Sequence, residues 1–192
     1  MKRRPPSRAA FGSRPTIKVG HWYTFNRGGR NETQFNIGMF GAPEYYVRVG
    51  MGFNFDRGGF GMPQAVERAF DCFTNVIGQR RTEFQQLVHE NSLQVEYVRQ
   101  IGAPLEYIPS PDMSSPDNSS PAMILERLPR LHRDIECKWI FIGRLLQRRG
   151  DLAILEDQAE LKRVIESVFT GFLRYWKQTL ACQKGDVNTV LP

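Results

Sequence analysis

The sequence predicts an α+β protein in which a mainly antiparallel sheet is packed by one helix from the N-terminal half and by a long amphipathic helix near the C-terminus. Three observations predict this class. Alternating apolar residues in the first third of the chain are typical of a β-meander, and two later stretches carry apolar residues at helical spacing. The order of the elements also lacks the strict βαβ alternation of a parallel, doubly wound sheet.

The meander consists of three predicted strands, at 16–25, 34–40 and 46–55, joined by turns. In the third strand, one face carries aliphatic and aromatic side chains and is expected to lie on the core. The other face carries Tyr46 and Arg48 among glycines, which leave room for another group to approach the backbone.

The middle of the chain predicts two helices and two short strands. Pro63 occupies the first helical position, where proline is tolerated, and apolar residues at helical spacing continue to Gly78, where the helix is expected to end. A second, short helix is expected after Thr82. Alternating residues then predict strands at 93–97 and 104–108.

The C-terminal part predicts a short helix at 123–128, an apolar strand at 135–142 and a final long helix. Asp157 and Glu160 form a capping-box-like start for the final helix. Its apolar stripe must pack against the sheet, and it consists of Leu161, Val164, Ile165, Val168, Phe169, Phe172 and Leu173.

The chain is long enough for one well-buried domain, which we place at 16–181, between a basic, disordered arm at 1–15 and a C-terminal tail at 182–192. Within it, the Ser/Pro-rich stretch 109–121 is expected to be a loop. The net charge is +6, but the arm holds five of the 26 basic residues and no acidic one, which leaves 21 basic against 20 acidic groups elsewhere. The arm is either a solvated tail or a segment that seeks phosphate.

Cysteine usage predicts neither a disulfide framework nor a structural zinc site, because Cys72, Cys137 and Cys182 are widely spaced and form no Cys-x-x-Cys pattern. No apolar signal segment follows the basic start. This favours a cytoplasmic protein with reduced thiols, with an organellar transit peptide as the alternative. No apolar stretch is long enough to cross a bilayer, so no membrane partner is expected.

Two nearly identical phrases point to a nucleic-acid partner: Phe-Asn-Arg-Gly-Gly at 25–29 and Phe-Asp-Arg-Gly-Gly at 55–59. Each phrase ends a predicted strand and suits a tight turn that holds an arginine beside backbone N–H groups. A guanidinium held in this way can bind a phosphate or a base edge. The predicted binding residues are Arg27, Arg30, Arg48 and Arg57 together with Trp22, Tyr45 and Tyr46. The alternative is that the aromatic residues lie in the core and the arginines in solvent.

An arginine- and aromatic-lined meander with helices behind it resembles the DNA-recognition domains attached to bacterial restriction systems. The resemblance implies a DNA-binding module of a restriction or defence-type system. One form of such a module reads a modified or unpaired base. Such a module needs no cofactor. It predicts binding that weakens with salt and is not followed by cleavage.

A second hypothesis is a Mg²⁺-dependent endonuclease. Glu136-Cys137-Lys138, after Pro111-Asp112 and Pro116-Asp117, resembles the P-D…(D/E)-x-K pattern of metal-dependent nucleases. If 135–142 is a strand, Glu136 and Lys138 share one side. Glu136 with Asp112 or Asp117 would then bind the metal, and Lys138 would orient the attacking water or stabilise charge at phosphorus.

Two observations weigh against the nuclease. The same Glu-x-Lys spacing occurs at 160–162 within a predicted helix, and both aspartates lie in the predicted loop, although Glu106 offers a substitute carboxylate. Glu136 and Lys138 are then the solvent side of a strand. A third hypothesis is a protein-interaction or assembly subunit, in which exposed aromatic residues of the meander form a contact with a second copy or a partner subunit.

Overall fold

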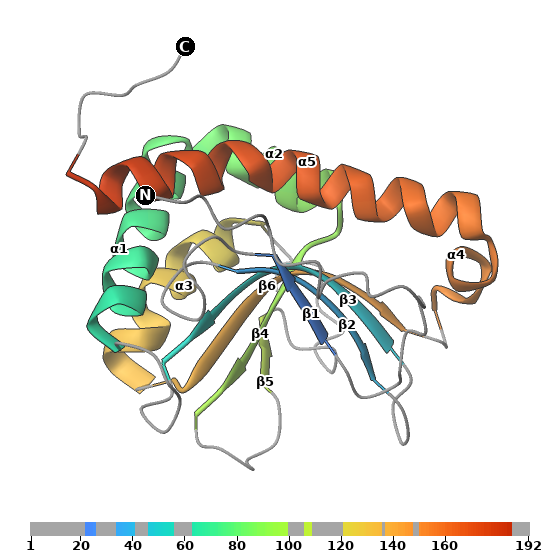
Figure 1. The fold of residues 1–192 in the computed structure, drawn as a ribbon, viewed down its shortest axis with the longest axis horizontal. Coiled ribbons are helices and arrows are strands. Elements are labelled where there is room, and N and C mark those ends of the chain that lie inside the picture. Colours follow the sequence, from blue (N-terminus) through green and yellow to red (C-terminus); the bar gives the residue numbers. More distant parts are fainter. Residues whose placement is uncertain are drawn as a thin grey trace, which may run out of the picture.

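A computed structural model of the chain describes residues 22–25, 34–40, 46–55, 63–99, 106–108, 121–135, 137–147 and 150–185 (Figure 1). The predicted arm at 1–15, the 26–29 and 56–59 parts of the two arginine phrases, and the Ser/Pro-rich stretch up to 120 lie outside these residues. None of the described helices has the length and apolar content that a membrane crossing requires.

The described strands form one six-stranded sheet in the order β1-β2-β3-β6-β4-β5, and every neighbouring pair is antiparallel. The predicted meander and the predicted antiparallel sheet are therefore confirmed. The strand that the sequence places last lies in the middle, between β3 and β4. The strands are β1 (Trp22–Phe25), β2 (Gln34–Phe40), β3 (Tyr46–Asn54), β4 (Gln94–Val98), β5 (Glu106–Ile108) and β6 (Trp139–Gln147).

All five described helices lie over one face of this sheet (Figure 1). They are α1 (Pro63–Gln79), α2 (Arg81–Glu90), α3 (Pro121–Ile135), α4 (Leu152–Glu156) and α5 (Gln158–Gln183). The core is formed between these helices and the alternate residues of β3 that were predicted to face it. For example, the ring of Phe53 lies 5.1 Å from that of Phe70 in α1, measured between centroids. Phe84, Phe172 and Tyr175 continue the core between α2 and α5.

Helix α5 begins as predicted. The Asp157 carboxylate accepts hydrogen bonds from the backbone N–H groups of Ala159 and Glu160, at 2.8 and 3.1 Å. Val168 and Phe172 of the predicted stripe are buried, but Leu173 is 39% exposed, so its assignment to the stripe is wrong. Leu173 lies about 100° around the helix axis from Phe172, at the edge of the face that the sheet and α2 cover.

Several element boundaries differ from the prediction. Helix α3 continues to Ile135 instead of ending near 128, because Leu128 and Leu131 extend its buried face past Pro129. The strand predicted from residue 135 therefore starts at Trp139 and runs on to Gln147. Helix α4 was not predicted, and α5 reaches Gln183, two residues into the predicted tail.

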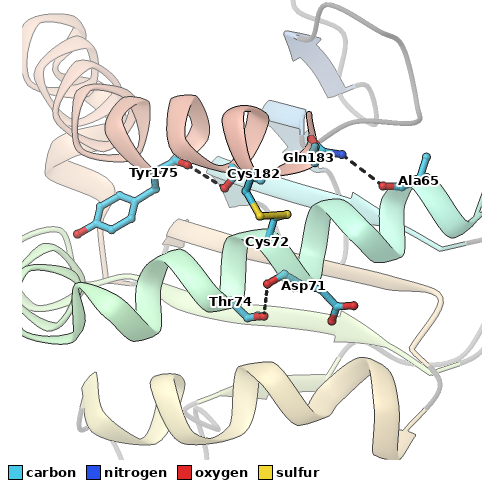
Figure 2. The surroundings of a disulfide bond; sticks show 8 residues. Ala65, Asp71, Cys72, Thr74, Tyr175, Cys182 and Gln183 are labelled. Atoms are coloured by element: carbon cyan, nitrogen blue, oxygen red, sulfur yellow. Dashed lines mark hydrogen bonds between the residues drawn. A yellow bond between two sulfur atoms is a disulfide. The ribbon is translucent and has the colours of Figure 1, made fainter. Parts of the chain in front are cut away.

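A disulfide joins Cys72 in α1 to Cys182 in the last turn of α5 (Figure 2). The two Cα atoms lie 5.8 Å apart, although 110 positions separate them in sequence. The Gln183 side-chain amide also donates to the carbonyl of Ala65, at 3.4 Å. The expectation of reduced thiols is wrong for this pair. Spacing along the chain did not reveal it, because the two cysteines meet only when α5 packs on α1.

The disulfide should stabilise the protein by restricting the unfolded chain. A loop of this length gives an upper estimate of about 5 kcal/mol. We expect the denaturant midpoint to fall when reductant is added, whereas a Cys72→Ala, Cys182→Ala variant should show one midpoint with and without reductant. Thiol titration of the unreduced, unfolded chain should find one free cysteine, and three would contradict the bond.

Candidate functional site

The strand register brings the starting points of the two arginine phrases to one end of the sheet. Phe25 is paired with Phe35, Gln34 with Gly52, and Asn54 with Trp139. The C-terminal ends of β1 and β3 and the N-terminal ends of β2 and β6 therefore lie together. We call this the Phe25 end of the sheet. Val98 of β4 is also there, because it is paired with Trp139.

The first residue of the second phrase is held on three sides. Phe55 is buried, and its backbone N–H donates to the carbonyl of Lys138 at 2.9 Å. Its ring stacks on His132 of α3, with centroids 4.1 Å apart and planes 13° from parallel, and meets Phe70 of α1 edge-on at 5.5 Å. Phe55, with which the second phrase begins, is thus held by the backbone of Lys138 and by α1 and α3.

The strand on which the nuclease hypothesis placed Lys138 begins only after that residue. Cys137 and Lys138 lie between α3 and β6, and the backbone N–H of Lys138 donates to the carbonyl of Val98 at 2.8 Å. The predicted strand therefore does not include Lys138, because β6 begins at Trp139. Residues Asp112, Asp117 and Glu136 lie outside the described part of the chain.

Carboxylates in the described part of the chain form no metal site. There, no group of three or more His, Cys, Asp or Glu side chains is placed to hold a metal ion. Glu106, the substitute ligand, is engaged by Arg99, whose Nε lies 2.7 Å from Oε1 and whose Nη2 lies 2.8 Å from Oε2. Tyr97 also donates its hydroxyl to Glu106 Oε2 at 2.9 Å. Burial, followed by this hydrogen bond, raises the pKa of Tyr97.

Cys137 is the third cysteine and is not bonded to another. Its side chain is buried, and this burial raises the pKa of the thiol to about 11. A buried thiol that stays protonated at neutral pH is a poor nucleophile. The position of Cys137 is therefore that of a core residue.

Arg48 lies in a buried polar network, and its assignment as a nucleic-acid ligand stays a prediction. Its guanidinium is buried, with Nη1 2.5 Å from Oε1 of Glu96. Its Nε donates to Oδ1 of Asn36 at 3.3 Å. Asn36 lies on β2, Arg48 on β3 and Glu96 on β4, so a chain of hydrogen bonds crosses the sheet on the face opposite the helices.

Aromatic rings and glycines complete this arrangement. The guanidinium carbon of Arg48 lies 5.1 Å from the ring centroid of Trp139 and 5.0 Å from that of Phe141. A Cβ atom at Gly52 would collide with the Trp139 ring, and one at Gly143 would come within 2.8 Å of the Phe141 ring. The glycines do leave room, as predicted, and the chain's own rings occupy it.

Asn36, Arg48, Glu96, Trp139 and Phe141 are together called the polar face. Asn36 and Glu96 are fully buried, whereas Trp139 is only half-buried. The Asn36 Nδ2 and the Trp139 Nε1 are buried donors that find no hydrogen-bond partner within the described part of the chain. Burying a donor in this way costs free energy, so each needs a reason to be there.

The other predicted binding residues stand as follows. Arg27, Arg30, Tyr45 and Arg57 lie outside the described residues. Trp22 is in β1, in register with Gly38, and Tyr46 is in β3, in register with Phe40 and Gln147. The structure thus brings Arg48 together with four residues that were not predicted. The one available signal was Glu96, the single charged residue of β4.

Breaking the buried pair should destabilise the fold more than removing it. Glu96→Gln leaves the Arg48 charge buried without its carboxylate, so we expect the free energy of unfolding to fall by about 3–5 kcal/mol. Arg48→Met combined with Glu96→Leu should lose less than either single variant, as measured by urea unfolding. Glu166→Gln, which removes the exposed partner of Lys162, serves as the control and should leave the midpoint unchanged. Additive losses in the double variant would contradict the coupling.

The Cys137 thiol should make stability fall at alkaline pH. Its pKa rises from 9.0 to about 11 in the folded protein, so the unfolded chain loses its proton first. Stability from this group is complete below pH 9 and is lost between pH 9 and about 11. Unfolding in a Cys72→Ala, Cys182→Ala background, which avoids disulfide exchange, should show this slope. Adding Cys137→Ala should reduce the slope, and an unchanged slope would contradict the assignment.

Comparisons with known proteins give no relative for this arrangement. No family model matches the chain, and neither a curated protein nor a solved structure matches it. What the polar face and the Phe25 end do must therefore be inferred from their own residues.

Proposed function

We propose that this chain is a DNA-binding protein that grips phosphates through Arg27, Arg30 and Arg57 at the Phe25 end of the sheet. The observation that carries the proposal is the register. The strands that lead into the two arginine phrases, β1 and β3, both finish at this end, as Phe25 and Asn54 show. Strands that finished at opposite ends would have left the phrases unable to meet one ligand.

The spacing of these strands suits a single nucleic-acid segment. β1 and β3 flank β2, so their axes are separated by two strand spacings, or about 10 Å. Arginines that follow two strands at this separation can contact neighbouring phosphates of one nucleic-acid backbone. Phe55 supports the second phrase through its contacts with His132 and Lys138.

The charge distribution of the chain favours a few local contacts with DNA over a general attraction of the whole protein to DNA. Outside the N-terminal arm, basic and acidic groups are nearly equal in number. Among the described residues at the Phe25 end, Arg99 is engaged with Glu106. Binding should therefore depend on a few phosphate contacts and should weaken with salt in proportion to their number.

The finer proposal, a recognition module of a restriction or defence-type system, rests on the resemblance of the arginine- and aromatic-lined meander alone. We do not propose the endonuclease, because β6 begins only at Trp139, so Lys138 precedes the strand that was to align it with Glu136. If the protein retains no DNA and self-associates, the result supports an assembly subunit instead.

Arg27→Ala with Arg57→Ala should weaken DNA binding and reduce its salt dependence. Each lost phosphate contact should lower the slope of log affinity against log salt by about 1. Fluorescence anisotropy with a labelled duplex at several salt concentrations measures both quantities. The matched control is Arg81→Ala with Arg163→Ala, which removes the same charge from exposed positions on α2 and α5. Equal losses in both variants would contradict a site at the Phe25 end.

A further inference from the structure

We propose that the Cys72–Cys182 bond is a redox-sensitive link, which a dithiol reductant opens and which controls how firmly the second arginine phrase is held. This inference rests on the proposed function and adds a regulation to it. With the bond closed, the protein holds DNA firmly. With the bond reduced, the protein stays folded but binds DNA more weakly.

The bond lies at the end of a helix, where a thiol can reach it. Cys182 belongs to the last turn of α5 and is partly exposed, and no residue of α5 beyond Thr179 is buried. Exposed disulfides are the ones that thiols reduce readily and that serve in regulation. A thiolate can therefore approach from the side of Cys182 while the core stays closed.

Reduction of the bond is a two-step exchange. A thiolate of the dithiol attacks the Cys182 sulfur, and the Cys72 sulfur leaves as a thiolate, which takes up a proton. The second thiol of the reductant then attacks the mixed disulfide and releases Cys182 as a thiol. Two electrons pass from the dithiol, which becomes a disulfide, to the two cysteines. The oxidised dithiol reverses each step.

Helix α5 stays in place when the bond opens, because it is anchored one turn earlier. Tyr175 and Thr179 are buried, and the Thr179 hydroxyl donates to the carbonyl of Tyr175 at 2.8 Å (Figure 2). Reduction therefore releases only the turn after Thr179, together with the hydrogen bond from Gln183 to Ala65. The two thiols remain close enough to be oxidised again.

The released turn holds one side of α1. It is joined to Ala65 by a hydrogen bond and to Cys72 by the disulfide. These two residues are about two helical turns apart and lie on the same side of α1. Glu67 and Phe70 are each two positions from one of them, or about 200° around the helix, and so lie on the opposite side.

The opposite side of α1 supports Phe55, the first residue of the second arginine phrase. Phe70 meets the Phe55 ring edge-on at 5.5 Å. Glu67 lies 3.5 Å from Nε2 of His132, on which Phe55 stacks. Release of the α5 turn frees the other side of α1 and so loosens this support. Because α1 keeps its buried residues, the result is a weaker hold on the phrase and not unfolding.

The reduced protein should bind duplex DNA about fivefold more weakly, at the low end of couplings between two sites. Fluorescence anisotropy with a labelled duplex, with and without dithiothreitol, measures this ratio. A Cys72→Ala, Cys182→Ala variant should bind like the reduced protein under both conditions. Cys137→Ala, which keeps the bond, is the control and should respond to dithiothreitol like the unaltered chain. Equal affinities of the reduced and bonded forms would overturn this inference and keep the proposed function.

The coupling must also act in the other direction. If DNA binds the bonded form more tightly, it should shift the thiol–disulfide equilibrium toward the bond by the same factor. The equilibrium is measured in mixtures of reduced and oxidised dithiothreitol, with and without the duplex, by alkylating the free thiols and counting them by mass spectrometry. An equilibrium that DNA does not move would overturn the inference.

Hydrogen exchange separates local release from unfolding. On reduction, we expect faster exchange in the last turn of α5 and between Glu67 and Cys72 in α1, while β3 and β6 stay protected. Loss of protection throughout the sheet, or a bond that dithiothreitol opens only when the whole protein unfolds, would overturn the inference. If neither form retains DNA, the proposed function is overturned and its regulation with it.

Discussion

The position of β6 between β3 and β4 is the constraint on which the rest of the structure depends. It requires the backbones of β3 and β6 to come very close at Gly50 and Gly143, where a side chain on Gly50 would collide with the β6 backbone. Because β6 lies there, Arg48 reaches Glu96 across it. The same placement brings Trp139 to the end of the sheet where β1 and β3 finish.

The two faces of the sheet carry different kinds of contacts. One face is covered by all the described helices and holds the core, which the Cys72–Cys182 bond fastens at the far end of α5. The other face holds a buried ion pair and aromatic rings. A one-residue slip of β3 would turn Arg48 toward the helix-covered core and leave Glu96 without its guanidinium. The pair therefore opposes the wrong register, which is a better-attested use of a buried ion pair than added stability.

Much of the fold could be predicted from local patterns. The bounds of β2 follow from strict alternation, the start of α1 from Pro63, and the start of α5 from the Asp157 cap. The start of β6 could not be predicted, because the apolar residues around position 135 suit a helix and a strand equally. The partner of Arg48 could not be predicted either, since it follows from strand order, and neither could the disulfide, which follows from helix packing. Of the predicted binding residues, Arg48 is buried beside Glu96, which no local pattern indicated, and all four arginines stay predictions as ligands.

The most direct test of the central claim is a map of the backbone amides that respond when duplex DNA is added, measured by NMR. The account predicts that the shifts gather at Phe25, Gln34, Asn54, Val98 and Trp139, which share one end of the sheet. Shifts that gathered instead at Phe40, Tyr46 and Gln147, at the opposite end, or along α5, would contradict it.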